Sequence, residues 1–164
     1  MLFVADYYAS KYLGDIVEIG AGYGENTKEL LKIAIKYNKK VIVIDPFEQG
    51  WGEMPKDYQY EYPIFEQNIK DYSQALILHK VNSLSEEAEK ALKVPICFAY
   101  VDGLQYKGAV INDICNVLHA QCICVDDIDR LTPKSQSVLA FDTIEPQYHT
   151  KIKQGRWGYM VSTK

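Results

Sequence analysis

A glycine-rich turn between two short apolar runs constrains the fold of this chain more than any other feature. Gly20, Gly22 and Gly24 follow the first run, and the second run, residues 41–44, ends on the carboxylate of Asp45. A strand, a glycine turn, a helix and a second strand that ends in an acid form the nucleotide-cofactor unit of α/β proteins. The glycines let the backbone approach a ligand closely, and Asp45 can accept hydrogen bonds from both hydroxyls of a ribose.

The rest of the sequence alternates between strand-like and helix-like patterns. Strands are expected at 16–19, 41–44, 75–81, 96–101 and 121–125, and helices from Asn26, at 64–74, at 86–92, around 110–118 and from Thr132 to about 143. Two alternating runs, 148–153 and 156–162, flank a Gln-Gly turn and predict a hairpin. We therefore predict one α/β domain, residues 1–164: a Rossmann-like, doubly wound, mostly parallel seven-stranded sheet with a C-terminal antiparallel hairpin.

Composition narrows the classes of partner. The net charge is -4, and Arg occurs only at positions 130 and 156, so two-pronged contacts to phosphate or guanine are poorly provided for and nucleic acid is disfavoured. No stretch approaches about 20 apolar residues, and the N-terminus lacks the pattern of a signal peptide, so we expect a cytoplasmic protein with no membrane contact. The four cysteines lie in apolar surroundings and are expected to be buried, reduced thiols.

The residues around the glycines favour a cofactor with a cationic group over a dinucleotide. A dinucleotide site has the pattern G-x-G-x-x-G, whereas Gly24 comes one residue early. Glu18, two residues before the first glycine, would repel a pyrophosphate but suits an amino group. E-x-G-x-G-x-G followed by a strand ending in Asp resembles the class I S-adenosylmethionine-dependent methyltransferases. The terminal hairpin also resembles the last two strands of that fold.

This resemblance implies a role for individual residues. Gly20 and Gly22 would pass under the methionine part of S-adenosylmethionine, with Glu18 near its amino group. Asp45 would hold the ribose hydroxyls, and Asn82-Ser83, just after the third strand, would meet the adenine. Ser83 has an alternative interpretation as the cap of the next helix, a role that Ser85 can also fill. Asn26 is expected to cap the helix after the glycine turn, in a reciprocal box with Glu29.

A second feature is a set of acids at the ends of two neighbouring strands. Asp102 follows the run 96–101, and Asp126-Asp127 follows the run 121–125. Ligands sit at the carboxyl edge of such a sheet, and three carboxylates there would repel one another unless a cation held them. Mg²⁺, a hard ion that prefers oxygen ligands, could do so. The alternative is that these acids are ordinary loop and helix-start residues.

The strand ends Tyr-x-Asp-Gly and Val-Asp-Asp resemble the metal-dependent macrocin- and mycinamicin-type sugar O-methyltransferases and the related cephalosporin-hydroxylase-like proteins. The resemblance runs from about residue 16 to 127 and implies that Asp102, Asp126 and Asp127 bind the ion. A coordinated hydroxyl has a lowered pKa and is held against the methyl group that it attacks.

The chain departs from this family where a catalytic base is expected. The family commonly reads D-G-D-x or D-G-x-H after the fourth strand, whereas Leu104 and Gln105 follow Asp102-Gly103 here. Asp129, in the loop of the metal acids, is a candidate replacement. The three histidines have structural interpretations. Residues 1–12, which are rich in aromatic side chains, could form a lid helix or a dimer contact.

Together these observations predict an S-adenosylmethionine-dependent methyltransferase. Its activity would be metal-assisted O-methylation of a small hydroxylated molecule, a sugar or polyol, with Asp102 and Asp129 as catalytic candidates and a homo-oligomer as a candidate assembly. One alternative is a non-catalytic cofactor-binding or partner-binding module, favoured by Leu104. The other is an NAD-linked oxidoreductase, disfavoured by Glu18 and by the glycine spacing.

Overall fold

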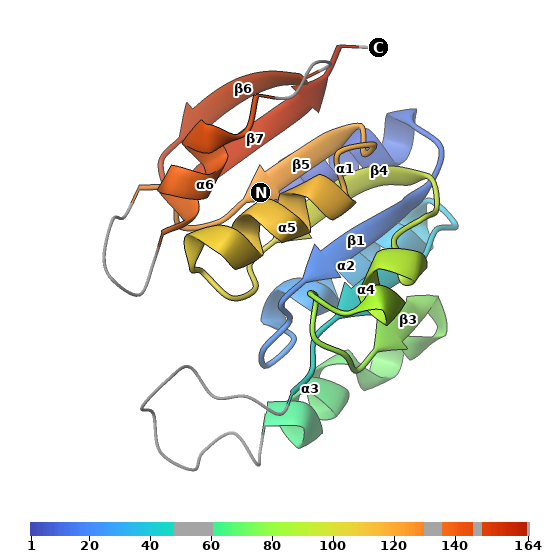
Figure 1. Cartoon of the computed structure of the whole chain (residues 1–164). Helices are drawn as coiled ribbons and strands as arrows, with labels where there is room; N and C mark the ends of the chain where they lie inside the picture. The colour runs from blue at the N-terminus through green and yellow to red at the C-terminus, as the bar shows by residue number, and fades with distance from the viewer. Residues whose placement is uncertain (48–60, 130–135, 146–148, 164) are drawn as a thin grey trace.

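The sheet has seven strands in the order β3-β2-β1-β4-β5-β7-β6. The computed structural model describes residues 1–47, 61–129, 136–145 and 149–163. The strands are β1 (Asp15–Ile19), β2 (Val41–Ile44), β3 (Leu76–His79), β4 (Ile96–Val101), β5 (Cys122–Val125), β6 (His149–Gln154) and β7 (Trp157–Ser162). The first five run parallel, and β7 lies antiparallel between β5 and β6 (Figure 1). This confirms the predicted α/β sheet with its C-terminal hairpin.

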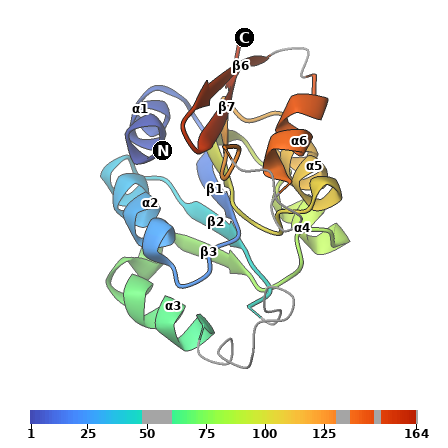
Figure 2. The same ribbon diagram turned by 90° about the vertical axis from the view of Figure 1, so that its left-hand side faces the viewer.

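Helices cover both faces of the sheet and make three layers. One face carries α1 (Leu2–Lys11), α2 (Glu25–Lys36) and α3 (Glu61–Ile69), and the other carries α4 (Glu86–Ala91), α5 (Lys107–Asn116) and α6 (Ser137–Thr143) (Figure 2). A short 3₁₀ helix, Lys70–Ala75, leads from α3 into β3. Each face has its own apolar cluster, because the central strands are buried on both sides. Continuous apolar runs such as Val41–Ile44 are what such a sheet requires.

Several local expectations need correction. Asn26 does not cap α2: the N-cap is Gly24, whose backbone has φ 80°, a left-handed conformation that favours glycine. Glu29 instead pairs with Lys32. Cys115 is exposed, since it lies on the outer side of α5, whereas the other three thiols are buried. The expected helix start at Thr132 lies outside the described residues.

Helix α1 is part of a helical layer and not a lid. Ala5, Tyr8 and Ala9 are buried in the same cluster as β1 and β4, and no residue of α1 lines the cavity described below. The dimer contact stays a prediction. In the described part of the chain, no helix is long and apolar enough to cross a membrane.

Candidate functional site

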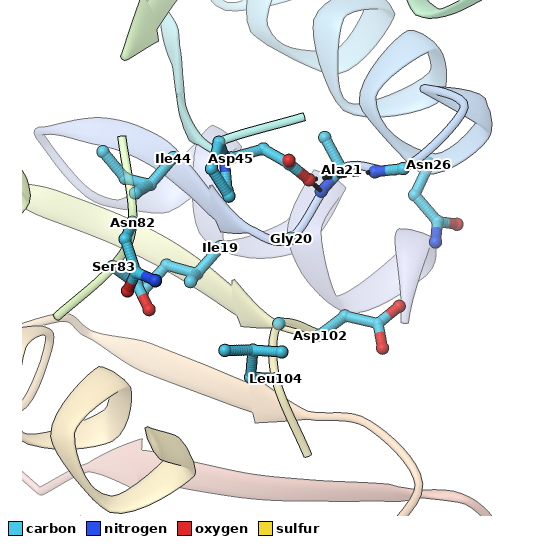
Figure 3. Close-up of a pocket in the computed structure, with 13 residues that line it drawn as sticks. Ile19, Gly20, Ala21, Asn26, Ile44, Asp45, Asn82, Ser83, Asp102 and Leu104 are labelled. Carbon is cyan, nitrogen blue, oxygen red and sulfur yellow. Dashed lines mark hydrogen bonds between the residues drawn. The ribbon is translucent and has the colours of Figure 1, made fainter. Parts of the chain in front are cut away.

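A cavity of about 240 Å³ opens at the carboxyl ends of β1, β2 and β4. The strand order reverses between β1 and β4, which is where open α/β sheets bind their ligands. The cavity walls bring together six of the residues singled out by the sequence (Figure 3): Gly20, Gly22, Asp45, Asn82, Ser83 and Asp102. Leu104 and Asn26 also line it.

Gly20 lets the turns after β1 and β4 approach each other. Its φ is +85°, and a Cβ at this position would lie 2.3 Å from the carbonyl oxygen of Asp102. The Asp102 N–H in turn donates to the Ile19 carbonyl oxygen at 2.8 Å. Any side chain at Gly20 would therefore separate the two turns. The glycine serves the packing of the site as well as the approach of a ligand.

Asp45 ties the end of β2 to the glycine loop. Its Oδ2 accepts hydrogen bonds from the N–H groups of Ala21 (2.7 Å) and Gly22 (3.2 Å), and its Oδ1 accepts one from Phe47 (2.8 Å). A carboxylate offers about four acceptor positions, so one remains beyond these three. Asp45 thus fixes the loop conformation and still faces the cavity (Figure 3).

Glu18 is buried beneath the glycine loop. One carboxyl oxygen, Oε2, accepts a hydrogen bond from the Thr27 hydroxyl at 2.5 Å, whereas Oε1 has no hydrogen-bond partner. Burial raises the pKa of Glu18 to about 8, against the opposing effect of Thr27, with Asp102 and Asp45 adding repulsion. A buried acid with one unpartnered oxygen is a place where a cationic group would be stabilised.

Asn82 and Ser83 form the wall opposite Asp102 (Figure 3). Asn82 Oδ1 accepts from the Leu84 N–H at 2.9 Å, which shapes the turn before α4. Ser83 does not cap that helix, because Ser85 Oγ accepts from the Ala88 N–H. Ser83 lines the cavity, and its hydroxyl also makes a hydrogen bond with the Asp113 carboxyl. Behind it, Asp113 is buried, and burial raises the pKa of its carboxyl to about 6.

The acids at the ends of β4 and β5 meet around one tyrosine hydroxyl. Tyr100 Oη lies 2.9 Å from Asp126 Oδ2 and 3.1 Å from Asp102 Oδ2. One hydroxyl hydrogen can serve only one of these acceptors at a time. Burial, and next the charge of Asp126, raise the pKa of Asp102 to about 7. The repulsion expected among these acids is therefore present.

The cation that holds the cluster is Arg156, which the sequence analysis did not assign to the site. Its Nε donates to Asp126 Oδ1 at 2.7 Å, and its terminal nitrogen donates to Asp126 Oδ2 and lies 3.0 Å from Asp127 Oδ1. Gln105 completes the group by donating to Asp127 Oδ2 at 2.9 Å. Asp127 has φ 52°, an uncommon backbone conformation for a residue other than glycine.

The structure places the other candidates outside the cavity. Glu18, Asp126 and Asp127 are not among its lining residues, and Asp129 is exposed and does not line it either. His119 and His149 lie near backbone carbonyl oxygens, of Val94 and Ala120. In the described ranges, no group of three His, Cys, Asp or Glu side chains is arranged to hold a metal ion.

Comparison with solved structures identifies the fold. No protein-family model matches the chain, and neither does any curated protein sequence. CalS11, described as a TDP-rhamnose 3'-O-methyltransferase in calicheamicin biosynthesis, is 14% identical with a TM-score of 0.70 over 98% of this chain and 77% of its own. An O-methyltransferase from Bacillus cereus in complex with SAH (S-adenosylhomocysteine) is 15% identical, with a TM-score of 0.67 over 99% of this chain and 80% of its own.

A further similar structure contains a metal. MycE, a methyltransferase of the mycinamycin biosynthetic pathway in complex with Mg and SAH, is 11% identical with a TM-score of 0.62, over 98% of this chain and 46% of its own. The chain thus has the fold of S-adenosylmethionine-dependent O-methyltransferases, as the sequence resemblance implied.

Proposed function

We propose that this protein transfers a methyl group from S-adenosylmethionine to a hydroxyl oxygen of a small hydroxylated molecule, a sugar or a polyol. The observation that carries the proposal is the cavity at the switch point between β1 and β4, where the glycine loop, Asp45 and Asp102 converge. The fold shared with O-methyltransferases supports it, as does the description of CalS11 as an enzyme that methylates a sugar nucleotide.

The residues present fit the cofactor at each of its polar ends. Glu18 has a buried, unpartnered carboxyl oxygen beneath the glycine loop, where its charge would stabilise the amino group, and Gly20 and Gly22 line the cavity where the methionine part would lie. Asp45 keeps one acceptor position, enough for one of the two ribose hydroxyls, and Asn82-Ser83 forms the wall where the adenine would lie.

Bound S-adenosylmethionine would supply an electrophilic methyl carbon on a sulfonium. The acceptor oxygen forms a bond to this carbon as the carbon–sulfur bond breaks, and the hydroxyl proton must leave. Within the described part of the cavity lining the carboxyls are those of Asp45 and Asp102, and Asp45 is already engaged by three backbone N–H groups. Asp102 is therefore the group that accepts the proton. Asp129, which is exposed, is the weaker candidate.

A metal-assisted form of the reaction would place Mg²⁺ among Asp102, Asp126 and Asp127, where it would lower the pKa of the acceptor hydroxyl. The arrangement of these side chains does not fit the ion, because Arg156 pairs with both Asp126 and Asp127. The proposed reaction therefore includes no step through a metal.

Calorimetric titration tests the proposal first at the level of the cofactor. S-adenosylmethionine and SAH are each titrated into the protein, with NAD as a negative control. Asp45→Asn should weaken binding roughly tenfold or more, because hydrogen bonds to a charged group contribute about 1.5–3 kcal/mol. Asp142→Asn is the matched control: this exposed acid pairs with Lys153 away from the cavity and should leave binding unchanged. Binding of NAD in place of the sulfonium pair would contradict the proposal.

A transfer assay then tests the reaction. Methyl transfer to a panel of sugars and polyols should be detected as SAH release, and Asp102→Asn should reduce turnover far more than it reduces cofactor binding. Cofactor binding with no transfer to any acceptor would favour the non-catalytic module, for which the apolar Leu104 in the cavity wall is the supporting observation.

A further inference from the structure

We infer that Arg156 is the built-in cation of the acidic cluster at the ends of β4 and β5, and that it keeps a latent divalent-cation site closed. The inference concerns ion binding alone. It does not depend on whether the neighbouring cavity binds S-adenosylmethionine or transfers a methyl group.

The first support is how completely Arg156 uses the acceptor positions of Asp126. The guanidinium donates to both carboxylate oxygens, and Oδ2 also accepts from the Tyr100 hydroxyl. Each carboxylate oxygen has two lone pairs, so Oδ2 is saturated when the Tyr100 hydrogen lies on it, and Oδ1 keeps one. A dication at that last position would be repelled by the adjacent guanidinium, so metal binding to Asp126 here is expected to require that the guanidinium move away. Planar, two-pronged pairing of this kind is the strongest that arginine makes with a carboxylate.

The second support is the position of the partners. The Asp126 side chain is 1% exposed and that of Asp127 is 12% exposed. Buried carboxylates without a cation would be strongly destabilised. A cation at this place is therefore strongly favoured over an empty site. Arg156 fills it from within the chain, whereas a metal ion would have to come from solution.

The third support is that backbone hydrogen bonds fix the position of the Arg156 main chain relative to the acids. Val125 pairs with Gly158 across β5 and β7, so the turn of the β6–β7 hairpin lies beside the loop that carries Asp126. The Ile128 N–H donates to the Arg156 carbonyl oxygen at 2.9 Å. Arg156 therefore starts from an anchored position directly opposite the acids, and its pairing is built into the strand register.

Removing Arg156 should open a site for a divalent cation. Asp102 and Asp126, which share the Tyr100 hydroxyl, and the neighbouring Asp127 would then present oxygen ligands without the guanidinium charge, which suits Mg²⁺ or Mn²⁺. Mn²⁺ is the practical probe, because the electron paramagnetic resonance signal of the free ion falls when it binds.

The experiment compares Mn²⁺ binding to four EDTA-treated, dialysed proteins: wild type, Arg156→Gln, Lys153→Gln and the double variant Arg156→Gln/Asp126→Asn. Lys153→Gln is the matched control, since it removes the same charge from the same hairpin but from a pair with Asp142, 2.7 Å away from its ammonium. Circular dichroism confirms that each variant is folded. No S-adenosylmethionine is present.

We expect Arg156→Gln to bind one Mn²⁺ with a Kd of about 0.1–1 mM, the range of weak oxygen-ligand sites, and at least roughly tenfold more tightly than wild type. Lys153→Gln should behave as wild type, and the double variant should lose the gain. The inference is overturned if wild type binds Mn²⁺ as tightly as Arg156→Gln, or if Arg156→Gln shows no gain.

A second variant decides the question if Arg156→Gln does not fold. Arg156→Lys keeps one positive charge, but an ammonium cannot reproduce the two-pronged contact with both oxygens of Asp126. It should bind Mn²⁺ measurably more tightly than wild type does. Binding no stronger than that of wild type would overturn the inference.

Discussion

Gly20 holds two turns together at the centre of the candidate site, and this makes its substitution costly for a reason independent of any ligand. Gly20→Ala would place a Cβ 2.3 Å from the Asp102 carbonyl oxygen at a φ of +85°. We expect the free energy of unfolding to fall by about 3 kcal/mol or more, which chemical denaturation would measure.

Gly155 provides the matched comparison for Gly20. It also has a positive φ, +59°, but a Cβ there would meet nothing within 4 Å. Gly155→Ala should therefore cost only the backbone strain, about 1 kcal/mol. Equal losses for the two variants would show that the close approach at Gly20 is not a constraint.

Glu18 should couple cofactor binding to the loss of a proton. With a pKa raised to about 8 by burial, the free carboxyl is mostly protonated at pH 7. A cationic amino group beside it favours the ionised form, so binding should release a proton, and affinity should increase with pH up to about 8. Titrations in buffers of different ionisation enthalpy would measure the number of protons released.

Glu18→Gln isolates this contribution from that of other acids. The amide keeps the size of the side chain and an acceptor for Thr27, but it cannot ionise. At pH 7 the variant should release up to one proton fewer than wild type and bind more weakly. An unchanged proton release would place the cofactor's amino group away from Glu18.

At the scale of elements, the structure at the start of α4 shows which of two serines caps the helix, a question that the sequence left open. Ser85 caps the helix, so Ser85→Ala should lower the free energy of unfolding by about 1 kcal/mol. Ser83 lines the cavity and does not cap α4. Ser83→Ala should weaken S-adenosylmethionine binding, with a smaller effect on stability, as denaturation and calorimetry on both variants would show. The reverse pattern would assign Ser83 to structure alone.

Strand patterns were predictable because the central strands are short, apolar and ended by acids or turn residues. The bounds of β2 and β4 agree with the expected 41–44 and 96–101. Helix starts were less predictable. Asn26 is a residue type that often caps helices, but α2 begins two residues earlier than this implies, with Gly24 as its N-cap in a left-handed backbone conformation. The same applies to Cys115, whose exposure depends on which side of α5 faces outward.

The positions of the acids at the carboxyl ends of β4 and β5 were predictable from the sequence, but their pairing with Arg156 was not. Asp102 and Asp126 follow strands, so their place at one edge of the sheet follows from the order of elements. Arg156 reaches them only because β7 runs antiparallel beside β5 in one register. Arginine occurs only twice in the chain, which singles out Arg156 as a candidate for a specific role. Without knowledge of the strand register, however, the sequence did not indicate which acids it would pair with.

At the scale of the whole molecule, the site depends on burying acids in a sheet covered on both faces. Burial is the leading cause of the raised pKa values of Glu18, Asp102 and Asp113, to about 8, 7 and 6. Loops at the carboxyl edge can turn these acids toward a ligand because the strands beneath them are rigid. The same burial makes the stability of the ligand-free protein depend on pH in an unusual direction.

We expect the free energy of unfolding to fall as the pH rises from about 5 to 8.5. Each of these acids ionises in the unfolded chain near its ordinary pKa but stays protonated in the folded protein up to its raised value. Their contribution to stability is therefore fully present below the unfolded pKa and is lost as the pH rises through the folded one. The fall should be on the order of 2–5 kcal/mol, measured by urea denaturation across this range.

Glu18→Gln should remove the Glu18 share of this fall, which extends furthest, up to about pH 8, because Glu18 has the highest of the three pKa values. The variant should be more stable than wild type at pH 8.5 and similar to it at pH 5. Glu86→Gln is a suitable control, since this side chain is 87% exposed and pairs only with Lys90 across one helical turn among its described contacts. A wild-type stability that rises from pH 5 to 8.5, as in proteins whose acids are mainly paired, would contradict the buried, protonated state of these carboxyls.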